Sequence, residues 1–187
     1  LEGFADALGK SGVDEIVLAE IYPAREENIY GISSEKLAEA IRLRGKACRV
    51  ISTFGEIADY IADLDMKVLV MDYDHNAPSA EHLEATHEKL YLAIRAKHPD
   101  IPYVMVTRPS DCFNPADRAA RFAIVKKTYD NAVARGDKNV YFVDGLSFGM
   151  TSHTYDLTMD SIHPNDAGFM RMADCIGLVL KHILSKK

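Results

Sequence analysis

Strand-like and helix-like segments alternate along the whole 187-residue chain, and this alternation constrains the fold more than any other feature. Short apolar runs such as 67–72 (KVLVMD) are typical of parallel strands that are covered on both faces. Segments such as 80–97 instead repeat apolar residues with the period of an amphipathic helix. Consecutive βα units join through right-handed crossovers and place helices on both faces of a parallel sheet. We therefore predict a three-layer α/β fold with a mainly parallel, five-stranded sheet.

The predicted elements follow one another without a linker or an internal repeat. The strands are expected at 15–21, 48–52, 67–72, 102–107 and 139–143, and the helices at 34–45, 56–64, 80–97, 116–134 and 165–184. Ser33 or Ser34 can cap the first of these helices, and Asn165 or Asp166 can cap the last. Ligands of such sheets bind beyond the carboxyl ends of the strands, so the segments that follow the strands are the place to look for a site.

Composition excludes several classes of partner. The net charge is −6, the pI is about 5.6 and basic residues never cluster beyond a pair, so neither a nucleic acid nor a membrane surface is expected as a partner. The chain contains no apolar run of the roughly 18 residues that a membrane span needs, and no secretory signal is visible. Three cysteines without a C-x-x-C spacing argue against a disulfide framework and a structural zinc site. We expect a reduced, cytoplasmic setting and no cofactor or metal. The sequence does not determine the oligomeric state or whether the N-terminus is complete.

Asp160 and His163 form the strongest chemical candidate. They lie three residues apart, just before the last predicted helix. In that arrangement the carboxylate can accept a hydrogen bond from one imidazole nitrogen and leave the other facing a nucleophile, which is the relation of orienter and base in a serine hydrolase. The D-x-x-H spacing is common, and the alternative is a pair that only caps and solvates a loop.

The residues around this pair resemble the SGNH (GDSL-type) serine hydrolases over 66–187. The segment 160–174 (DSIHPNDAGFMRMAD) is similar to the last block of that family, and 68–78 (VLVMDYDHNAP) is similar to the block of one branch in which an Asn contributes to the oxyanion hole. The resemblance implies a flavodoxin-like sheet, His163 as general base, Asp160 as its orienter and Asn76 as oxyanion donor. It also implies a small-molecule or carbohydrate ester as substrate.

The chain departs from the family pattern in two ways. Asp74 stands where a Gly is usual, and Ala77 stands where an Asp is usual; an acidic side chain pointing toward an oxyanion would be unhelpful. The Gly-Asp-Ser block that carries the nucleophile is absent upstream of Asn76. Removing a triad serine lowers turnover by roughly 10⁶ in another hydrolase, so we expect little or no activity.

Residues 4–62 resemble a different family, the UDP-N-acetylmuramate–amino-acid ligases, and the alanine-adding ligase in particular. The resemblance rests on Tyr22-Pro-Ala-Arg-Glu26, on Gly-Ile-Ser-Ser at 31–34 and on Arg-Leu-Arg-Gly at 42–45, all found in the C-terminal domain of those ligases. The chain lacks a phosphate loop of the form G-x-x-x-x-G-K-S/T, so ligase activity is not expected. We predict a chimera of a ligase-like segment, 1–64, and a hydrolase-like segment, 65–187; whether they pack as one domain stays open.

These observations leave two principal functions open. The first is an ester hydrolase or its inactive remnant, and the alternative is a non-catalytic α/β module or a fragment of a ligase that makes peptidoglycan precursors. Ser33 or Ser34 could replace the missing nucleophile, although a simple helix cap is the plainer interpretation. A metal site formed by His75, His82 and His87 and a pocket role for Arg108 and Asp111 are weaker candidates.

Overall fold

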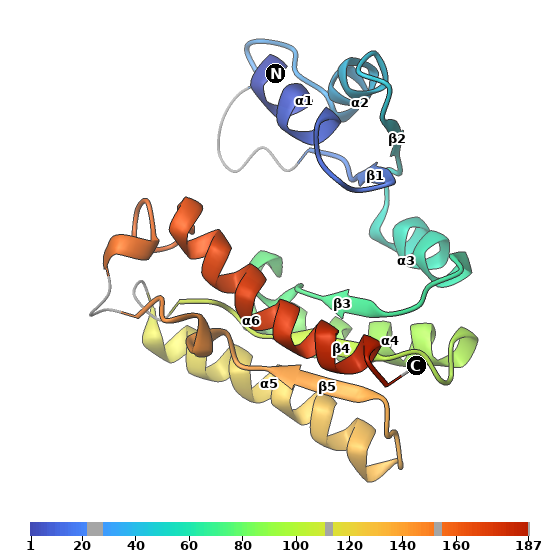
Figure 1. Ribbon diagram of the computed structural model, residues 1–187, viewed down its shortest axis with the longest axis vertical. Helices are drawn as coiled ribbons and strands as arrows, with labels where there is room; N and C mark the ends of the chain where they lie inside the picture. Colours follow the sequence, from blue (N-terminus) through green and yellow to red (C-terminus); the bar gives the residue numbers. More distant parts are fainter. Residues whose placement is uncertain (22–27, 111–113, 152–154, 187) are drawn as a thin grey trace. The chain divides into compact units, whose positions relative to one another are not determined.

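The computed structural model describes residues 1–21, 28–110, 114–151 and 155–186. The chain divides into two compact units, Leu1–Leu64 and Asp65–Lys187, and each is considered by itself. The first contains α1 (Glu2–Gly9), β1 (Glu15–Leu18), α2 (Ser34–Arg42), β2 (Ala47–Val50) and α3 (Phe54–Asp63) (Figure 1). The second contains β3 (Leu69–Met71), η1 (Asp74–Asn76), α4 (Ala80–Lys97), β4 (Tyr103–Val106), α5 (Pro115–Ala134), β5 (Val140–Val143), η2 (Gly145–Phe148), η3 (Tyr155–Leu157) and α6 (Asp166–Leu184).

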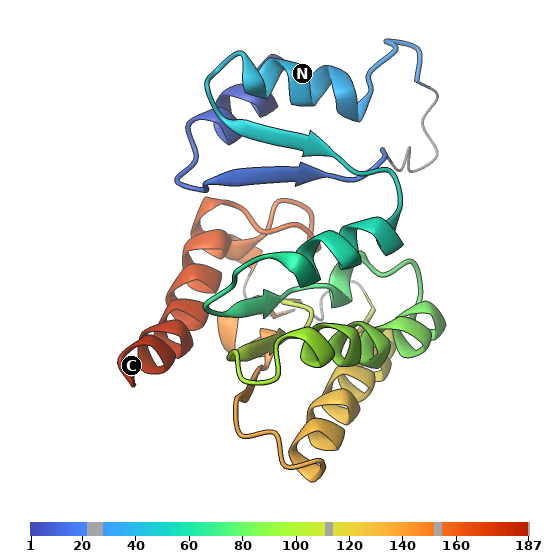
Figure 2. The same ribbon diagram turned by 90° about the vertical axis from the view of Figure 1, so that its right-hand side faces the viewer.

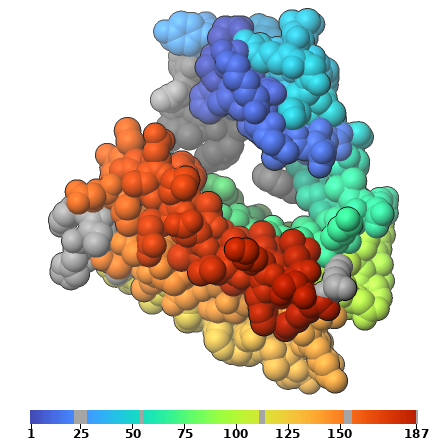
Figure 3. Space-filling model, viewed as in Figure 1, coloured from blue at the N-terminus to red at the C-terminus, as the bar shows by residue number. Residues whose placement is uncertain are grey.

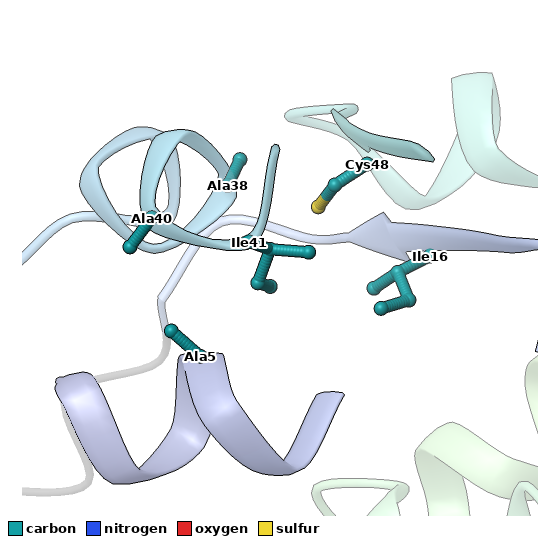
Figure 4. Packing of buried hydrophobic residues seen from close by; sticks show 6 residues of the cluster. All are labelled: Ala5, Ile16, Ala38, Ala40, Ile41 and Cys48. Atoms are coloured by element: carbon teal, nitrogen blue, oxygen red, sulfur yellow. The ribbon is translucent and has the colours of Figure 1, made fainter. Parts of the chain in front are cut away.

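The first unit is a parallel two-stranded sheet covered by two helices. Strands β1 and β2 pair from Glu15 opposite Ala47 to Leu18 opposite Val50, and α1 packs against α2 on one side of them (Figure 2). The small core between the layers is shown in Figure 4 and consists of Ala5, Ile16, Ala38, Ala40, Ile41 and Cys48. Ser33 caps α2 by accepting a hydrogen bond from the backbone N–H of Lys36, as predicted for one of the two serines.

The second unit has three layers. Its sheet has the strand order β3-β4-β5, all parallel, with α4 and α5 on one face and α6 on the other (Figures 1 and 2). Alternate residues of β4 face opposite layers, as the period of a strand requires. Val104 and Val106 pack in the core beneath α6, whereas the ring of Tyr103 meets Tyr91 of α4 edge-on, 5.3 Å between centroids. Helix α6 forms an outer surface of this unit (Figure 3).

The α/β class is confirmed, but the prediction of a single five-stranded sheet is wrong. The five strands are all present and form one sheet of two strands and one of three. Among the described residues, β1 and β2 pair only with each other, and β3 pairs with no strand other than β4. The physical reason is that apolar periodicity identifies strands without specifying their neighbours, and each group of strands here buries its apolar face in a core of its own. In the described part of the chain, no helix is both long and apolar enough to cross a membrane.

Candidate active site

The segments that follow the three strands of the second unit meet at one edge of its sheet. Thr107 follows β4, and Gly145 begins η2 after β5. The backbone N–H of Gly145 donates a hydrogen bond to Thr107 Oγ1 at 2.8 Å. Ser110 and Met150 form a β-bridge further along the same two segments. Gly145 is required here, since a Cβ would lie 2.2 Å from the carbonyl oxygen of Arg108. The segments after β4 and β5 are therefore in contact at the carboxyl edge of the sheet, the edge at which ligands of parallel sheets bind.

Asp160 and His163 are held in contact within one tight loop. His163 Nδ1 lies 2.6 Å from Asp160 Oδ2, and Asp160 Oδ1 accepts hydrogen bonds from the backbone N–H groups of Ile162 (3.0 Å) and His163 (2.7 Å). These hydrogen bonds lower the pKa of Asp160 to about 2, the His163 N–H contributing most. The carboxylate is therefore ionised near neutral pH, and it directs the Nδ1 proton of a neutral imidazole toward itself.

The loop is closed at its base by backbone bonds. Thr158 and Pro164 form an antiparallel bridge, and the N–H of Met159 donates to the carbonyl of His163 at 2.8 Å. Ser161 completes the reversal with a left-handed φ of 70°, a conformation that is uncommon for a residue with a side chain. Asn165 then caps α6 by accepting from the N–H of Gly168, as predicted for Asn165 or Asp166.

Two observations connect this loop with the ends of β4 and β3. The hydroxyl of Ser110, after β4, donates to the carbonyl of Ser161 at 3.3 Å. The pKa of His75, in η1 after β3, is lowered first by burial, then by the positive charges of Arg108 and His163. His163 and η1 therefore lie within electrostatic reach of each other at one edge of the sheet.

Asn76 ends η1 and is exposed, with its backbone N–H bonded to the carbonyl of Tyr73. Asp74, the residue that seemed unfavourable beside an oxyanion, is fully buried, and its Oδ2 accepts a hydrogen bond from the backbone N–H of Arg108 at 2.7 Å. Burial raises the pKa of Asp74, while the Arg108 N–H and the charges of Arg121 and Arg108 oppose that rise. The Asp74 carboxylate therefore belongs to the scaffold beneath η1.

Arg121 of α5 supports the same turn and was missed from the sequence. Its Nη1 donates to the carbonyl oxygens of Asp74 (2.8 Å) and Ala77 (3.1 Å), on either side of Asn76, and its Nε donates to Asp117. Arg108 donates to the same Asp117 carboxylate. The i,i+4 spacing of Asp117 and Arg121 signals an ion pair, but nothing in the sequence signals that the pair reaches the turn after β3.

The remaining candidates are accounted for separately. His87 is a core residue: its Nδ1 lies 2.9 Å from Thr128 Oγ1, and burial lowers its pKa to about 4. Within the described residues, no three His, Cys, Asp or Glu side chains are placed to hold a metal ion. Arg108 is nearly buried and pairs with Asp117, and Asp111 lies outside the described residues, as does the Tyr22–Glu26 motif.

Ser33 and Ser34 both have structural contacts within the first unit. Ser33 is the N-cap of α2, and the buried Ser34 donates its hydroxyl proton to the carbonyl of Ala19 at 2.7 Å. These contacts fit the interpretation of the two serines as a helix cap and its neighbour.

Comparison with curated proteins confirms the likeness to the alanine-adding ligases. The chain is 50% identical over 58 residues to UDP-N-acetylmuramate–L-alanine ligase of Lachnospira eligens, which covers 31% of this chain and 12% of the ligase. It is 37% identical over 67 residues to the ligase of Caldicellulosiruptor saccharolyticus, covering 36% and 14%. The chain thus spans about one eighth of the length of these relatives.

Solved structures and a family profile point to the other resemblance. A protein described as a GDSL-like lipase from Bacteroides ovatus superimposes with a TM-score of 0.60 at 23% identity, over 92% of this chain and 54% of that one. A family 3 carbohydrate esterase from Talaromyces cellulolyticus gives 0.56 at 16% identity, over 75% and 73%. These likenesses establish the α/β fold. The profile of the GDSL-like Lipase/Acylhydrolase family matches residues 52–181, and the chain belongs to that family.

Proposed function

We propose that the second unit carries the acid–base half of an acyl ester hydrolase site, without a serine nucleophile of its own. His163 is the general base, Asp160 orients it, and the Asn76 amide is the oxyanion donor. The observation that carries the proposal is the 2.6 Å contact between His163 Nδ1 and Asp160 Oδ2 in a chain of the GDSL-like family. A carboxylate bonded to one imidazole nitrogen leaves the other as the proton acceptor that ester hydrolysis requires.

The placement of Asn76 is supported by its neighbours. His163, when protonated, contributes to lowering the pKa of His75, and Arg121 donates to the carbonyls on both sides of the Asn76 turn. An amide on a rigid turn can stabilise a developing oxyanion without reorganising, which is where most of such stabilisation arises. The expected ligand is an O-acyl ester on a carbohydrate or small molecule, the chemistry named for the carbohydrate esterases of similar fold.

A fluorophosphonate probe tests the absence of the nucleophile. Such probes form a covalent bond with an activated serine, so we expect mass spectrometry to find no labelled serine in the full chain. We also expect no release of acetate from an O-acetylated cello-oligosaccharide above the uncatalysed rate. Labelling of one serine, for example Ser33 or Ser34, would show that the chain does contain a nucleophile.

Binding tests the three named residues independently of turnover. In a titration with the same acetylated oligosaccharide, the nuclear magnetic resonance signals of the Asn76 side-chain amide and the His163 ring should shift together. His163→Gln should weaken the binding, and His182→Gln, at an exposed position of α6, should not. Shifts confined to other parts of the second unit would reject the site.

A non-catalytic role is the second candidate, and the partial likeness to the ligases favours it for the first unit. We expect no ATP turnover and no ligation of alanine, because the matched segment is about one eighth of a ligase. Isothermal calorimetry with ATP and with alanine would detect binding if the first unit retained part of the ligase site.

A further inference from the structure

The contact between Asp160 and His163 leaves the second imidazole nitrogen available. An ionised carboxylate can only accept, so the Asp160 oxygen 2.6 Å from Nδ1 selects the tautomer with its proton on Nδ1. Nε2 then carries the lone pair. The His163 side chain is 69% exposed, so a small solute can approach the ring without any movement of the protein.

The ring is also held in position. The carboxylate that binds it accepts two further hydrogen bonds from the backbone of its own loop, and that loop is closed by the bridge between Thr158 and Pro164. Ser110 Oγ donates to the loop carbonyl at Ser161. An oriented imidazole with a fixed tautomer loses little freedom in a transition state, so its attack on a carbonyl has a smaller entropic cost than attack by a free one.

Neutral imidazole is itself a nucleophile toward acyl groups, and histidine is among the side chains that form covalent intermediates. We propose that this chain hydrolyses activated aryl esters of short carboxylic acids, with His163 Nε2 as the nucleophile that accepts the acyl group. The proposal rests on the Asp160–His163 pair of the proposed function but needs no serine.

Each step of the reaction balances. The Nε2 lone pair forms a bond to the ester carbonyl carbon, the bond from that carbon to the phenol oxygen breaks, and the phenolate leaves with the electron pair. The acyl-imidazolium that results shares its Nδ1 proton with Asp160. Water then adds to the acyl carbon and gives up one proton, which passes through solvent to the phenolate. The C–N bond breaks with its electron pair returning to Nε2, and the carboxylic acid is released as neutral His163 is restored. The sum is ester plus water giving acid plus phenol.

The chemistry limits the substrate class. An alkoxide is a poorer leaving group than imidazole, so the tetrahedral adduct of an alkyl or sugar ester returns to reactants. A phenolate leaves the tetrahedral adduct about as readily as imidazole does, so aryl acetates and similarly activated short acyl esters are the expected substrates. Sugar acetates lie outside this reaction, which separates it from the serine route of the family.

The test uses the full chain and p-nitrophenyl acetate, with His163→Ala, His163→Gln and Asp160→Asn. The matched control is His182→Ala, which removes another exposed histidine of the same unit. Both His163 variants should lower the second-order rate at least about tenfold, and Asp160→Asn should lower it by roughly tenfold or more, because the tautomer is no longer fixed. His182→Ala should stay within about twofold of the unchanged chain, since a single unoriented imidazole adds little.

Two further readouts identify the nucleophile. Pretreatment with a fluorophosphonate should leave the rate unchanged, and mass spectrometry of an acid-quenched reaction should find the acetyl group on the peptide that contains His163. A rate unaffected by both His163 variants overturns the inference. Inhibition by the fluorophosphonate together with a labelled serine also overturns it and would support a serine hydrolase instead. If only the nucleophilic role of His163 fails, binding of a carbohydrate ester at Asn76 and His163 is unaffected, so the two proposals can be told apart.

Discussion

Asp160 accepts three hydrogen bonds from its own loop, and a single carboxylate thus determines the conformation of residues 160–163. Two of the donors are backbone N–H groups and the third is the His163 ring. All three favour the ionised form, which explains the pKa of about 2 although the group is exposed to solvent. The orientation of His163 is therefore a local property, independent of the burial that fixes most catalytic side chains.

A pH titration of this loop tests that conclusion. The pKa of Asp160 is about 2 in the folded loop against 3.8 for an unperturbed carboxyl, so the ionised form is favoured by folding. The hydrogen bonds it makes are fully present above pH 3.8 and are lost as the pH falls through 2. The amide signals of Ile162 and His163 should therefore be unchanged at pH 3.5, and Asp160→Asn should abolish their low-pH titration. A midpoint near 3.8 would contradict the prediction.

Helix α5 and the start of α6 determine the geometry of the site at the scale of elements. Arg121 of α5 holds the carbonyls beside Asn76, while Gly168 of α6 passes so close to the η3 segment that a Cβ would lie 2.2 Å from the carbonyl oxygen of Leu157. That carbonyl also accepts the N–H of Asn165. The two turns of the proposed site thus depend on helices that contribute none of its three proposed residues.

Arg121→Met should destabilise the second unit. The substitution keeps the aliphatic stem but leaves the backbone carbonyls of Asp74 and Ala77 without their donor, and it removes the charge that pairs with the buried Asp74 carboxylate. Breaking a buried pair in this way typically costs about 3–5 kcal/mol. Lys126→Met removes an exposed pair with Asp130 on the same helix and should cost less than about 1 kcal/mol. Urea unfolding measures both, and equal small losses would mean that Arg121 does not support the turn.

Two glycines of α6 provide a matched pair. Gly168→Ala forces its methyl group into the Leu157 carbonyl and should cost about 1–3 kcal/mol. Gly177 has no atom within 4 Å of the position of a Cβ, so Gly177→Ala should stabilise the helix by up to about 1 kcal/mol. Thermal unfolding should shift in opposite directions, and shifts of the same sign would contradict the close approach at Gly168.

His87 makes the packing of α4 on α5 sensitive to pH. Its pKa is lowered from 6.5 to about 4 by burial, and its Nε2 lacks a hydrogen-bond partner among the described residues. Between these two values the unfolded chain binds a proton that the folded chain does not. The free energy of unfolding should therefore fall by up to about 3 kcal/mol as the pH drops from 7 toward 4. In urea unfolding at several pH values, the His87→Leu variant should lose this part of the pH dependence of the free energy of unfolding. An unchanged pH dependence would exclude His87 as its source.

At the scale of the whole molecule, the two units have hydrophobic cores that differ in the size of their side chains and in the number of elements that supply them. The first relies on a few side chains, half of them alanines, whereas the second buries residues of β4, β5, η2 and α6 together. Small domains bury a smaller fraction of their apolar surface and are correspondingly marginal. The junction of the two resemblances and the boundary between the units fall in the same part of the chain, around α3.

Hydrogen exchange should therefore separate the units. Amides of β1 and β2, such as those of Ile16 and Cys48, should exchange faster than those of Val104 and Val106 in β4, because the first unit opens at a lower free energy. Mass spectrometry after proteolysis provides the measurement. Equal protection across both sheets, together with a single unfolding transition, would mean that the chain unfolds as one cooperative body.

The sequence did not predict α1 (Glu2–Gly9), which precedes the first strand. By itself it determined the five strands, the helix after each of them and the Asp160–His163 pair, and it narrowed two helix caps to Ser33 or Ser34 and to Asn165 or Asp166. These depend on contacts over a few residues, where apolar period, hydrogen-bonding type and spacing are sufficient. Only the tertiary structure decided which strands pair, that Asp74 is buried with its carboxylate beneath the Asn76 turn, and that Arg121 supports this turn from 44 residues away. Such contacts depend on which faces of distant elements meet, and a periodic pattern specifies a face without specifying its partner.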